Sequence, residues 1–91
     1  MTDVHHETAF FSGRVQGVGF RYTVMQVAKE FDVAGYVRNL PDGRVQLEAE
    51  GRPDQTDGFI RAIQARMHGY VRSVARVREK RERQFNSFKI K

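Results

Sequence analysis

Gly17, Gly19 and Arg21 stand together where an apolar, strand-like run gives way to an amphipathic, helix-like one. Residues 13–21 have the sequence Gly-Arg-Val-Gln-Gly-Val-Gly-Phe-Arg. Glycines allow a tight turn and a close approach of the backbone to a ligand. The free N–H groups at the start of the following helix point into that turn, and a guanidinium adds donors that match phosphate oxygens. The stretch predicts a cradle for a small phosphate-bearing anion, with a plain tight connection as the alternative.

An amide side chain is expected to come level with this turn. A helix from about Arg21 to Asp32 carries the chain about 18 Å away. A strand that begins at Ala34 returns at about 3.3 Å per residue, so residue 39 comes back to the level of the turn. That residue is Asn39, which brings a donor and an acceptor to the cradle. The alternatives are that Asn39 caps its own turn before Pro41 and that Arg21 is a surface helix residue.

The elements that must position these residues follow from hydrophobic periodicity and turn signals. Helices are expected at about 21–32 and 54–69, and strands at about 7–15, 34–40, 44–50, 71–78 and, for a short last strand, within 85–90. Strands 34–40 and 44–50 should form a hairpin, and Ala75 with Val77 should point inward. The order β-α-β-β-α-β plus a C-terminal strand predicts a ferredoxin-like α+β sandwich, with two helices on one face of an antiparallel sheet.

The length, the net charge and the cysteine content limit the possible classes of protein. The chain has 91 residues, a net charge of +5 and no cysteine. The basic excess favours anionic partners. We expect a solvated face rather than a nucleic-acid surface, because Glu79 and Glu82 interrupt the basic run near the end. The absence of cysteine excludes a disulfide framework and a thiolate nucleophile.

One domain over residues 7–91 is expected, preceded by a flexible tail at 1–6 that contains His5 and His6. No apolar run approaches the length of a membrane span, and the first residues lack the apolar centre of a signal peptide. We therefore expect a cytoplasmic protein without a membrane partner.

Two long motifs resemble those of the acylphosphatase family. An apolar residue followed by x-Gly-x-Val-Gln-Gly-Val-x-Phe-Arg corresponds to residues 11–21, and Gly-aromatic-Val-basic-Asn-x-x-x-Gly-x-Val with a later Gly corresponds to 35–51. A weaker resemblance extends over about 7–90 and includes the order of the elements. Phe11 stands where the family usually has an aliphatic residue, and Tyr70 where a proline is common.

The resemblance implies hydrolysis of the carboxyl–phosphate bond of acyl phosphates to a carboxylate and inorganic phosphate, without a metal or cofactor. It implies that phosphate is held by backbone N–H groups of Gln16, Gly17, Val18, Gly19, Phe20 and Arg21. By the same resemblance, the Arg21 side chain also binds phosphate and Asn39 positions the attacking water. A carboxylate leaving group, whose acid has a pKa of roughly 4, departs at neutral pH without a general acid.

Three other classes of function share this order of elements. An RNA-recognition module needs exposed aromatics on a central strand, whereas residues 44–50 carry none. An acylphosphatase-like domain can also belong to a larger maturation factor that handles carbamoyl phosphate. A sensing domain of the same fold would usually need a dimer, whereas no long exposed apolar edge is evident here and we expect a monomer.

Overall fold

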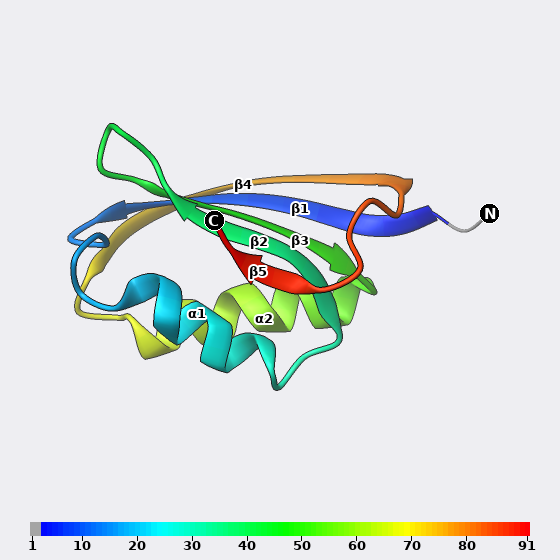
Figure 1. Ribbon diagram of the computed structural model, residues 1–91, viewed down its shortest axis with the longest axis horizontal. Coiled ribbons are helices and arrows are strands. Elements are labelled where there is room, and N and C mark those ends of the chain that lie inside the picture. Colours follow the sequence, from blue (N-terminus) through cyan, green and yellow to red (C-terminus); the bar gives the residue numbers. More distant parts are fainter. Residues whose placement is uncertain (1–2) are drawn as a thin grey trace.

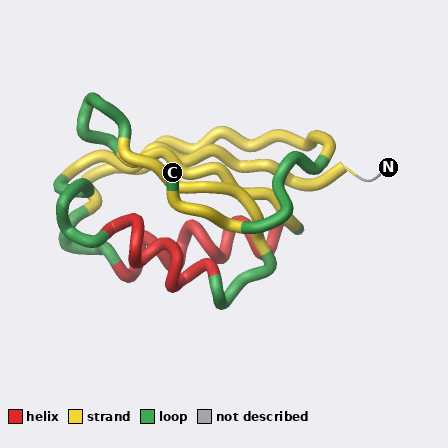
Figure 2. The backbone as a smooth tube through the Cα atoms, viewed as in Figure 1, coloured by secondary structure: helices red, strands yellow, loops and turns green. Residues whose placement is uncertain are grey.

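The computed structural model describes residues 3–91 as a five-stranded sheet with two helices packed on one face (Figures 1 and 2). The elements are β1 (Asp3–Gly13), α1 (Phe20–Ala28), β2 (Val33–Asn39), β3 (Val45–Gly51), α2 (Pro53–Arg66), β4 (Val71–Glu82) and β5 (Phe88–Ile90). The strands lie in the order β4-β1-β3-β2-β5. This arrangement confirms the predicted ferredoxin-like fold and places β4 and β5 at opposite edges.

The sheet is mixed, so the prediction that it is antiparallel is wrong for one strand. β1 pairs with β3 and β4, and β2 pairs with β3, all antiparallel. β5 runs parallel to β2, with Gly35 opposite Phe88 and Val37 opposite Ile90. Along the chain β3, α2 and β4 separate the parallel pair β2 and β5, and residues 83–87 carry the chain from β4 at one edge of the sheet to β5 at the other.

The start of the described chain belongs to the sheet, which corrects the predicted flexible tail at 1–6. β1 begins at Asp3, and His6 is only 1% exposed. The reason is that β4 runs to Glu82, four residues further than predicted, so Asp3 finds a partner in Glu82. Residues 1 and 2, the rest of the predicted tail, lie outside the described residues.

The core fills the space between the sheet and the helices. The ring of Phe11 on β1 meets that of Phe20 on α1 at 5.1 Å between centroids. The ring of Phe59 on α2 meets that of Phe88 on β5 at 5.2 Å. Each fully buried large side chain contributes about 1.5–3 kcal/mol of hydrophobic free energy. These contacts fix α1, and with it the start of the helix, against the sheet. No helix in residues 3–91 has both the length and the apolar character needed to cross a membrane.

The inward pair predicted for β4 is wrong. Val77 is 59% exposed, and Ala75 is also exposed. Val71 and Val74 both pack against the core although they are three residues apart, because the register between β1 and β4 shifts at Ser12 and Gly13. That shift changes which residues of β4 face the helices.

Residues 83–87, which connect β4 to β5, are held by hydrogen bonds and ring packing against the face of the sheet opposite the helices. The buried carboxylate of Glu50 accepts hydrogen bonds from the backbone N–H groups of Gln84 (2.9 Å) and Phe85 (3.0 Å). The Phe85 ring also packs on Tyr36 edge-on at 5.8 Å. These contacts direct the chain along the outer edge of β2, so that β5 ends beside the start of α1.

Candidate active site

The turn between β1 and α1 is shaped by two glycines with left-handed backbone angles. Gly17 has φ 77° and Gly19 has φ 76°. A Cβ at either position would meet no atom within 4 Å, so the backbone angle, rather than lack of space, calls for glycine. Gly19 is also the N-cap of α1, with no side-chain hydrogen bond to the first turn. The N–H groups of that turn are therefore available to a ligand.

A glutamine side chain joins this turn to the β2–β3 hairpin. Nε2 of Gln16 donates hydrogen bonds to the carbonyl oxygens of Leu40 (2.8 Å) and Arg44 (2.9 Å). This contact holds the cradle beside the end of β2, where Asn39 is the last residue. Sequence reasoning assigned Gln16 only a backbone role in the cradle. Nothing in the local sequence indicates these side-chain hydrogen bonds, because the two acceptors lie 24 and 28 residues away from Gln16.

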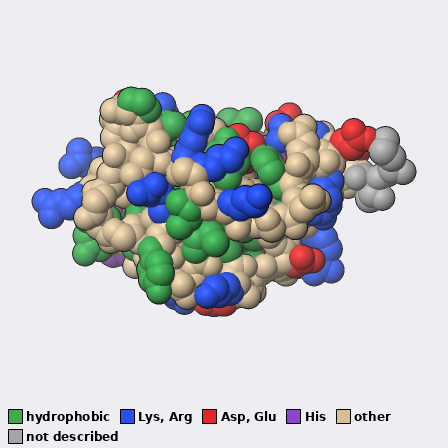
Figure 3. All heavy atoms as spheres, viewed as in Figure 1, with side chains coloured by type: hydrophobic (Ala, Val, Ile, Leu, Met, Phe, Trp, Pro, Cys, Tyr) green, Lys and Arg blue, Asp and Glu red, His purple; other side chains and the backbone are tan. Residues whose placement is uncertain are grey.

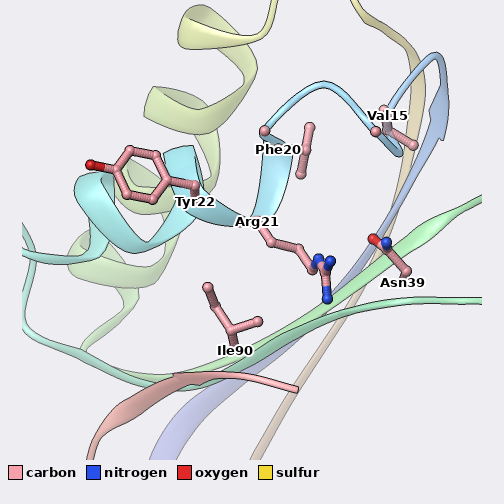
Figure 4. Close-up of a pocket in the computed structure, with 8 residues that line it drawn as sticks. Val15, Phe20, Arg21, Tyr22, Asn39 and Ile90 are labelled. Atoms are coloured by element: carbon pink, nitrogen blue, oxygen red, sulfur yellow. The ribbon is translucent and has the colours of Figure 1, made fainter.

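A pocket of about 270 Å³ opens over the turn (Figure 4). Its lining comes from the turn, the start of α1, the end of β2 and the end of β5, and comprises Val15, Gly17, Gly19, Phe20, Arg21, Tyr22, Asn39 and Ile90. Arg21 and Asn39 thus share one pocket. Gln16 and Val18, predicted as cradle residues, do not line it, and Val18 packs against the core.

Arg21 supplies the only charged side chain in the lining. Its guanidinium extends from the first turn of α1 toward Asn39 (Figure 4). Nη1 donates a long hydrogen bond, 3.4 Å, to the carbonyl oxygen of Lys91. The positive end of the α1 dipole and this guanidinium act on the same space. The pocket therefore suits a small anion with several acceptor oxygens.

Asn39 carries a buried acceptor without a partner. Its Oδ1 is shielded from solvent and accepts no hydrogen bond within the described chain. The predicted alternative, that Asn39 caps its own turn, is not what holds the hairpin. That turn is closed by the Leu40 N–H bonded to the Arg44 carbonyl at 2.8 Å and by Asp42, which accepts from the Arg44 N–H at 3.1 Å. A buried, unpaired carbonyl oxygen is unfavourable unless a ligand or water completes it.

Charged side chains are spread over the molecule outside the pocket. On the face shown in Figure 3, Lys and Arg side chains lie among hydrophobic and other atoms. Over residues 3–91, no three His, Cys, Asp or Glu side chains are grouped so that they could hold a metal ion. The donors at the pocket are backbone N–H groups of the turn, the Asn39 amide and the Arg21 guanidinium.

Comparison with known proteins gives the family. The profile described as Acylphosphatase matches residues 7–90. An acylphosphatase of Methanospirillum hungatei is 50% identical over 60 residues, which cover 66% of this chain and 66% of that protein. An acylphosphatase of Bordetella parapertussis is 35% identical over 97% of both chains. The crystal structure of acylphosphatase from Bacillus subtilis superposes with a TM-score of 0.85 at 31% identity, covering 94% of this chain and 97% of that one.

The extent of these matches differs between relatives. The chain spans just under two thirds of the length of the Methanospirillum hungatei protein and 63% of its relative from Archaeoglobus fulgidus, but nearly all of the Bordetella parapertussis protein. The matched profile, by contrast, includes both the cradle and the hairpin that carries Asn39. With a profile match over nearly its whole length, the chain belongs to the acylphosphatase family.

Proposed function

We propose that this protein is an acylphosphatase, which hydrolyses the carboxyl–phosphate bond of acyl phosphates. The observation that carries the proposal is the unpartnered Oδ1 of Asn39 in the pocket that also holds Arg21 and the start of α1. The pocket combines donors for an anion with an acceptor for a neutral O–H group. Those are the needs of a phosphoryl group and of the water that attacks it.

In this proposal, N–H groups of the cradle and the Arg21 guanidinium bind the phosphoryl oxygens. These donors are held by the fold before substrate arrives, so they stabilise the developing charge without rearrangement. Asn39 accepts a hydrogen bond from the water and turns an oxygen lone pair toward phosphorus. An amide is no base near neutral pH, so Asn39 orients the water and does not deprotonate it.

The bond changes balance without another group. The water oxygen forms a bond to phosphorus while the bond from phosphorus to the acyl oxygen breaks, and its electron pair leaves with the carboxylate. The water proton passes to a phosphoryl oxygen. Because the leaving carboxylate is a weak base, with a conjugate acid of pKa roughly 4, no general acid is required. We also propose that the chain works as a cytoplasmic monomer without a cofactor or metal.

A continuous assay with benzoyl phosphate tests this function. We expect turnover that persists in the presence of a chelator and is inhibited competitively by inorganic phosphate. Arg38→Ala is a matched control, because this neighbour of Asn39 is exposed and its Nε bonds Gln46 outside the pocket. Its turnover should stay within about twofold of the wild type. Turnover that requires an added divalent metal, or no turnover, would contradict the proposal.

A further inference from the structure

Two arginine side chains, where β1 ends and β4 begins, have no partner within the described residues. Every other arginine within residues 3–91 donates a side-chain hydrogen bond or forms an ion pair. The guanidiniums of Arg14 and Arg72 do neither, and both residues are exposed. A guanidinium carries a fixed charge and a planar fork of donors that matches phosphate oxygens. Two unpaired guanidiniums at one place can therefore hold an anion between them.

Both arginines line one hollow of about 450 Å³, which is larger than the 270 Å³ pocket over the β1–α1 turn. Its lining comes from the end of β1 and from the connection of α2 to β4, and comprises Gly13, Arg14, Gly69, Tyr70, Val71 and Arg72. None of these residues is acidic, and none lines the pocket that contains Arg21 and Asn39. Figure 3 shows Lys and Arg side chains projecting from this end of the molecule, at the left of the view.

The backbone below Arg14 is held close to the connection of α2 to β4. The N–H group of Arg14 donates a hydrogen bond to the carbonyl oxygen of Tyr70 at 2.9 Å. Gly13 has φ 125°, and a Cβ there would lie 2.5 Å from the same carbonyl oxygen and 2.7 Å from the backbone nitrogen of Arg72. The two segments approach this closely because Gly13 has no side chain. The fold thus fixes the backbones that carry the two arginines relative to each other.

Arg72 is the extra residue of a β-bulge between β1 and β4. Ser73 pairs with Ser12 and Val71 pairs with Gly13, so no residue of β1 lies opposite Arg72. A bulge takes a side chain out of the regular alternation of the strand, and bulges are common next to functional sites. The irregularity in the register therefore falls on one of the two unpaired arginines that line the hollow.

We propose that Arg14 and Arg72 form a second anion site, which binds the phosphate group of a small phosphorylated metabolite or free inorganic phosphate. A phosphate monoester carries about −1.5 to −2 charge at pH 7, which two guanidiniums balance. Its three terminal oxygens offer enough acceptors for two arginine forks, whereas a carboxylate has one charge and two oxygens. The inference goes beyond the proposed acylphosphatase function, because the hollow contains neither Arg21 nor Asn39.

NMR titration of the full chain with inorganic phosphate tests the second site, at an ionic strength kept constant with sodium chloride. The backbone amides of Gly13 and Gly69 are the hollow reporters, and those of Gly17 and Gly19 are the cradle reporters. We expect both pairs of amide signals to shift as phosphate is added. We also expect the two pairs to give separate dissociation constants, because the two sites share no lining residue.

Substitutions should separate the two sites. Arg14→Ala and Arg72→Ala should each weaken phosphate binding at the hollow reporters about tenfold, which is the scale of one lost charge-assisted hydrogen bond. Binding at the cradle reporters should stay within about twofold in both variants. Arg21→Ala should do the reverse. Arg83→Ala is the matched control, because Arg83 is an exposed arginine just beyond the other end of β4 and should leave both constants unchanged.

A second titration, with glycerol 3-phosphate, distinguishes the two sources of the phosphate group. Shifts of the hollow reporters with both compounds would show that the site accepts the phosphate end of a metabolite. Shifts with inorganic phosphate alone would restrict the site to the free ion. Either result supports the site.

The second site is overturned if the hollow reporters do not shift with phosphate. It is also overturned if they shift with the same constant in the Arg14→Ala/Arg72→Ala double variant, because the anion would then bind without the two guanidiniums. Neither result affects the proposed acylphosphatase function, which is judged by the cradle reporters and by turnover of benzoyl phosphate. Conversely, a chain that fails to hydrolyse benzoyl phosphate can still show the hollow shifts.

Discussion

At the scale of single residues, Arg21 and Asn39 are proposed to act on different species. Arg21 has a fixed positive charge and, in this proposal, contacts the phosphoryl group in both the bound and the reacting state. Asn39 is neutral and offers an acceptor that suits only a donor such as water. Substitutions at the two positions should therefore separate binding from turnover.

Arg21→Ala should abolish detectable phosphate binding and lower kcat/KM by more than about 10³-fold, because one preorganised cation at a transferring phosphoryl group contributes at least that much. Titration calorimetry with inorganic phosphate and the benzoyl phosphate assay measure the two effects. Phosphate affinity that survives in Arg21→Ala would place the anion elsewhere.

Asn39→Ala should lower kcat by about 10²-fold to 10³-fold, the usual effect of removing one positioned polar group, and leave phosphate affinity within about threefold. The same calorimetry and assay apply, with Arg38→Ala as the control. If Asn39→Ala weakens phosphate binding as much as turnover, Asn39 binds the anion and does not orient water.

Sequence reasoning placed Asn39 beside the cradle because helix rise and strand rise are fixed lengths, and the structure brings the two together. The same reasoning could not find Ile90 or the side-chain role of Gln16. Both depend on where distant segments cross in space: β5 beside β2 for Ile90, and the hairpin carbonyls for Gln16. Periodicity within one segment carries no information on such crossings.

At the scale of elements, the pairing of β2 with β3 depends on one glycine. Gly35 has φ 152°, and a Cβ there would lie 1.8 Å from the carbonyl oxygen of Glu48. The two strands therefore approach more closely than any other residue allows. Because β2 ends in Asn39, this approach also sets the position of the proposed water-orienting amide.

Gly35→Ala should lower the free energy of unfolding by more than about 3 kcal/mol, since backbone atoms must separate to admit the methyl group. Gly69→Ala is the matched control, because a Cβ there meets nothing within 4 Å and its φ is not in the left-handed range. It should change stability by no more than about 0.5 kcal/mol. Urea denaturation measures both, and equal losses in the two variants would contradict the argument.

Element boundaries were predicted less well than element order, for a physical reason. α1 ends at Ala28 rather than at Asp32, and Phe31 beyond it packs against α2, where a Cβ on Gly58 would come within 2.8 Å of its ring. β4 is four residues longer than its apolar pattern indicates because β1 offers it partners as far as Asp3. In both cases a tertiary contact decides the boundary, whereas alternation and turn residues decide the order.

At the scale of the whole molecule, Glu7 makes the stability of the fold depend on pH on the acid side. Burial raises the pKa of Glu7, but hydrogen bonds and charges from Arg76 and Arg78 outweigh it, so the pKa lies below the ordinary 4.5. A carboxylate with a lowered folded-state pKa stabilises the fold above its unfolded pKa. That contribution is lost as the pH falls through the folded value.

Glu7→Gln should therefore be less stable than the wild type at pH 7, by on the order of 3 kcal/mol for a broken buried pair. The difference should shrink as the pH falls below about 4.5, because the wild type then loses the same interaction. Urea midpoints between pH 2 and 7 measure this. A constant difference across that range would contradict the linkage.

The stability of the fold at alkaline pH depends on Tyr36. Burial, the hydrogen bond to Glu48 and the charge of Glu48 raise the pKa of Tyr36 from 10.0 to about 12. A raised folded-state pKa gives stability that is complete below pH 10 and lost as the pH rises through about 12. Tyr36→Phe should therefore flatten the alkaline limb of the stability profile, measured by urea midpoints from about pH 8 to about pH 12, and leave the acid limb in place.

The pairing of β1 with β4 brings the first strand beside one of the last, with Asp3 opposite Glu82. A nascent chain of which only residues 1–51 have left the ribosome already contains the cradle, α1 and the hairpin, but β1 has only β3 beside it and not yet β4. Pairing strands so far apart in the sequence costs the entropy of closing a long loop before the stabilising contacts form. Folding is therefore slow for a domain of this size. The completed pocket, with Ile90 in place, therefore forms only after synthesis has passed the last strand.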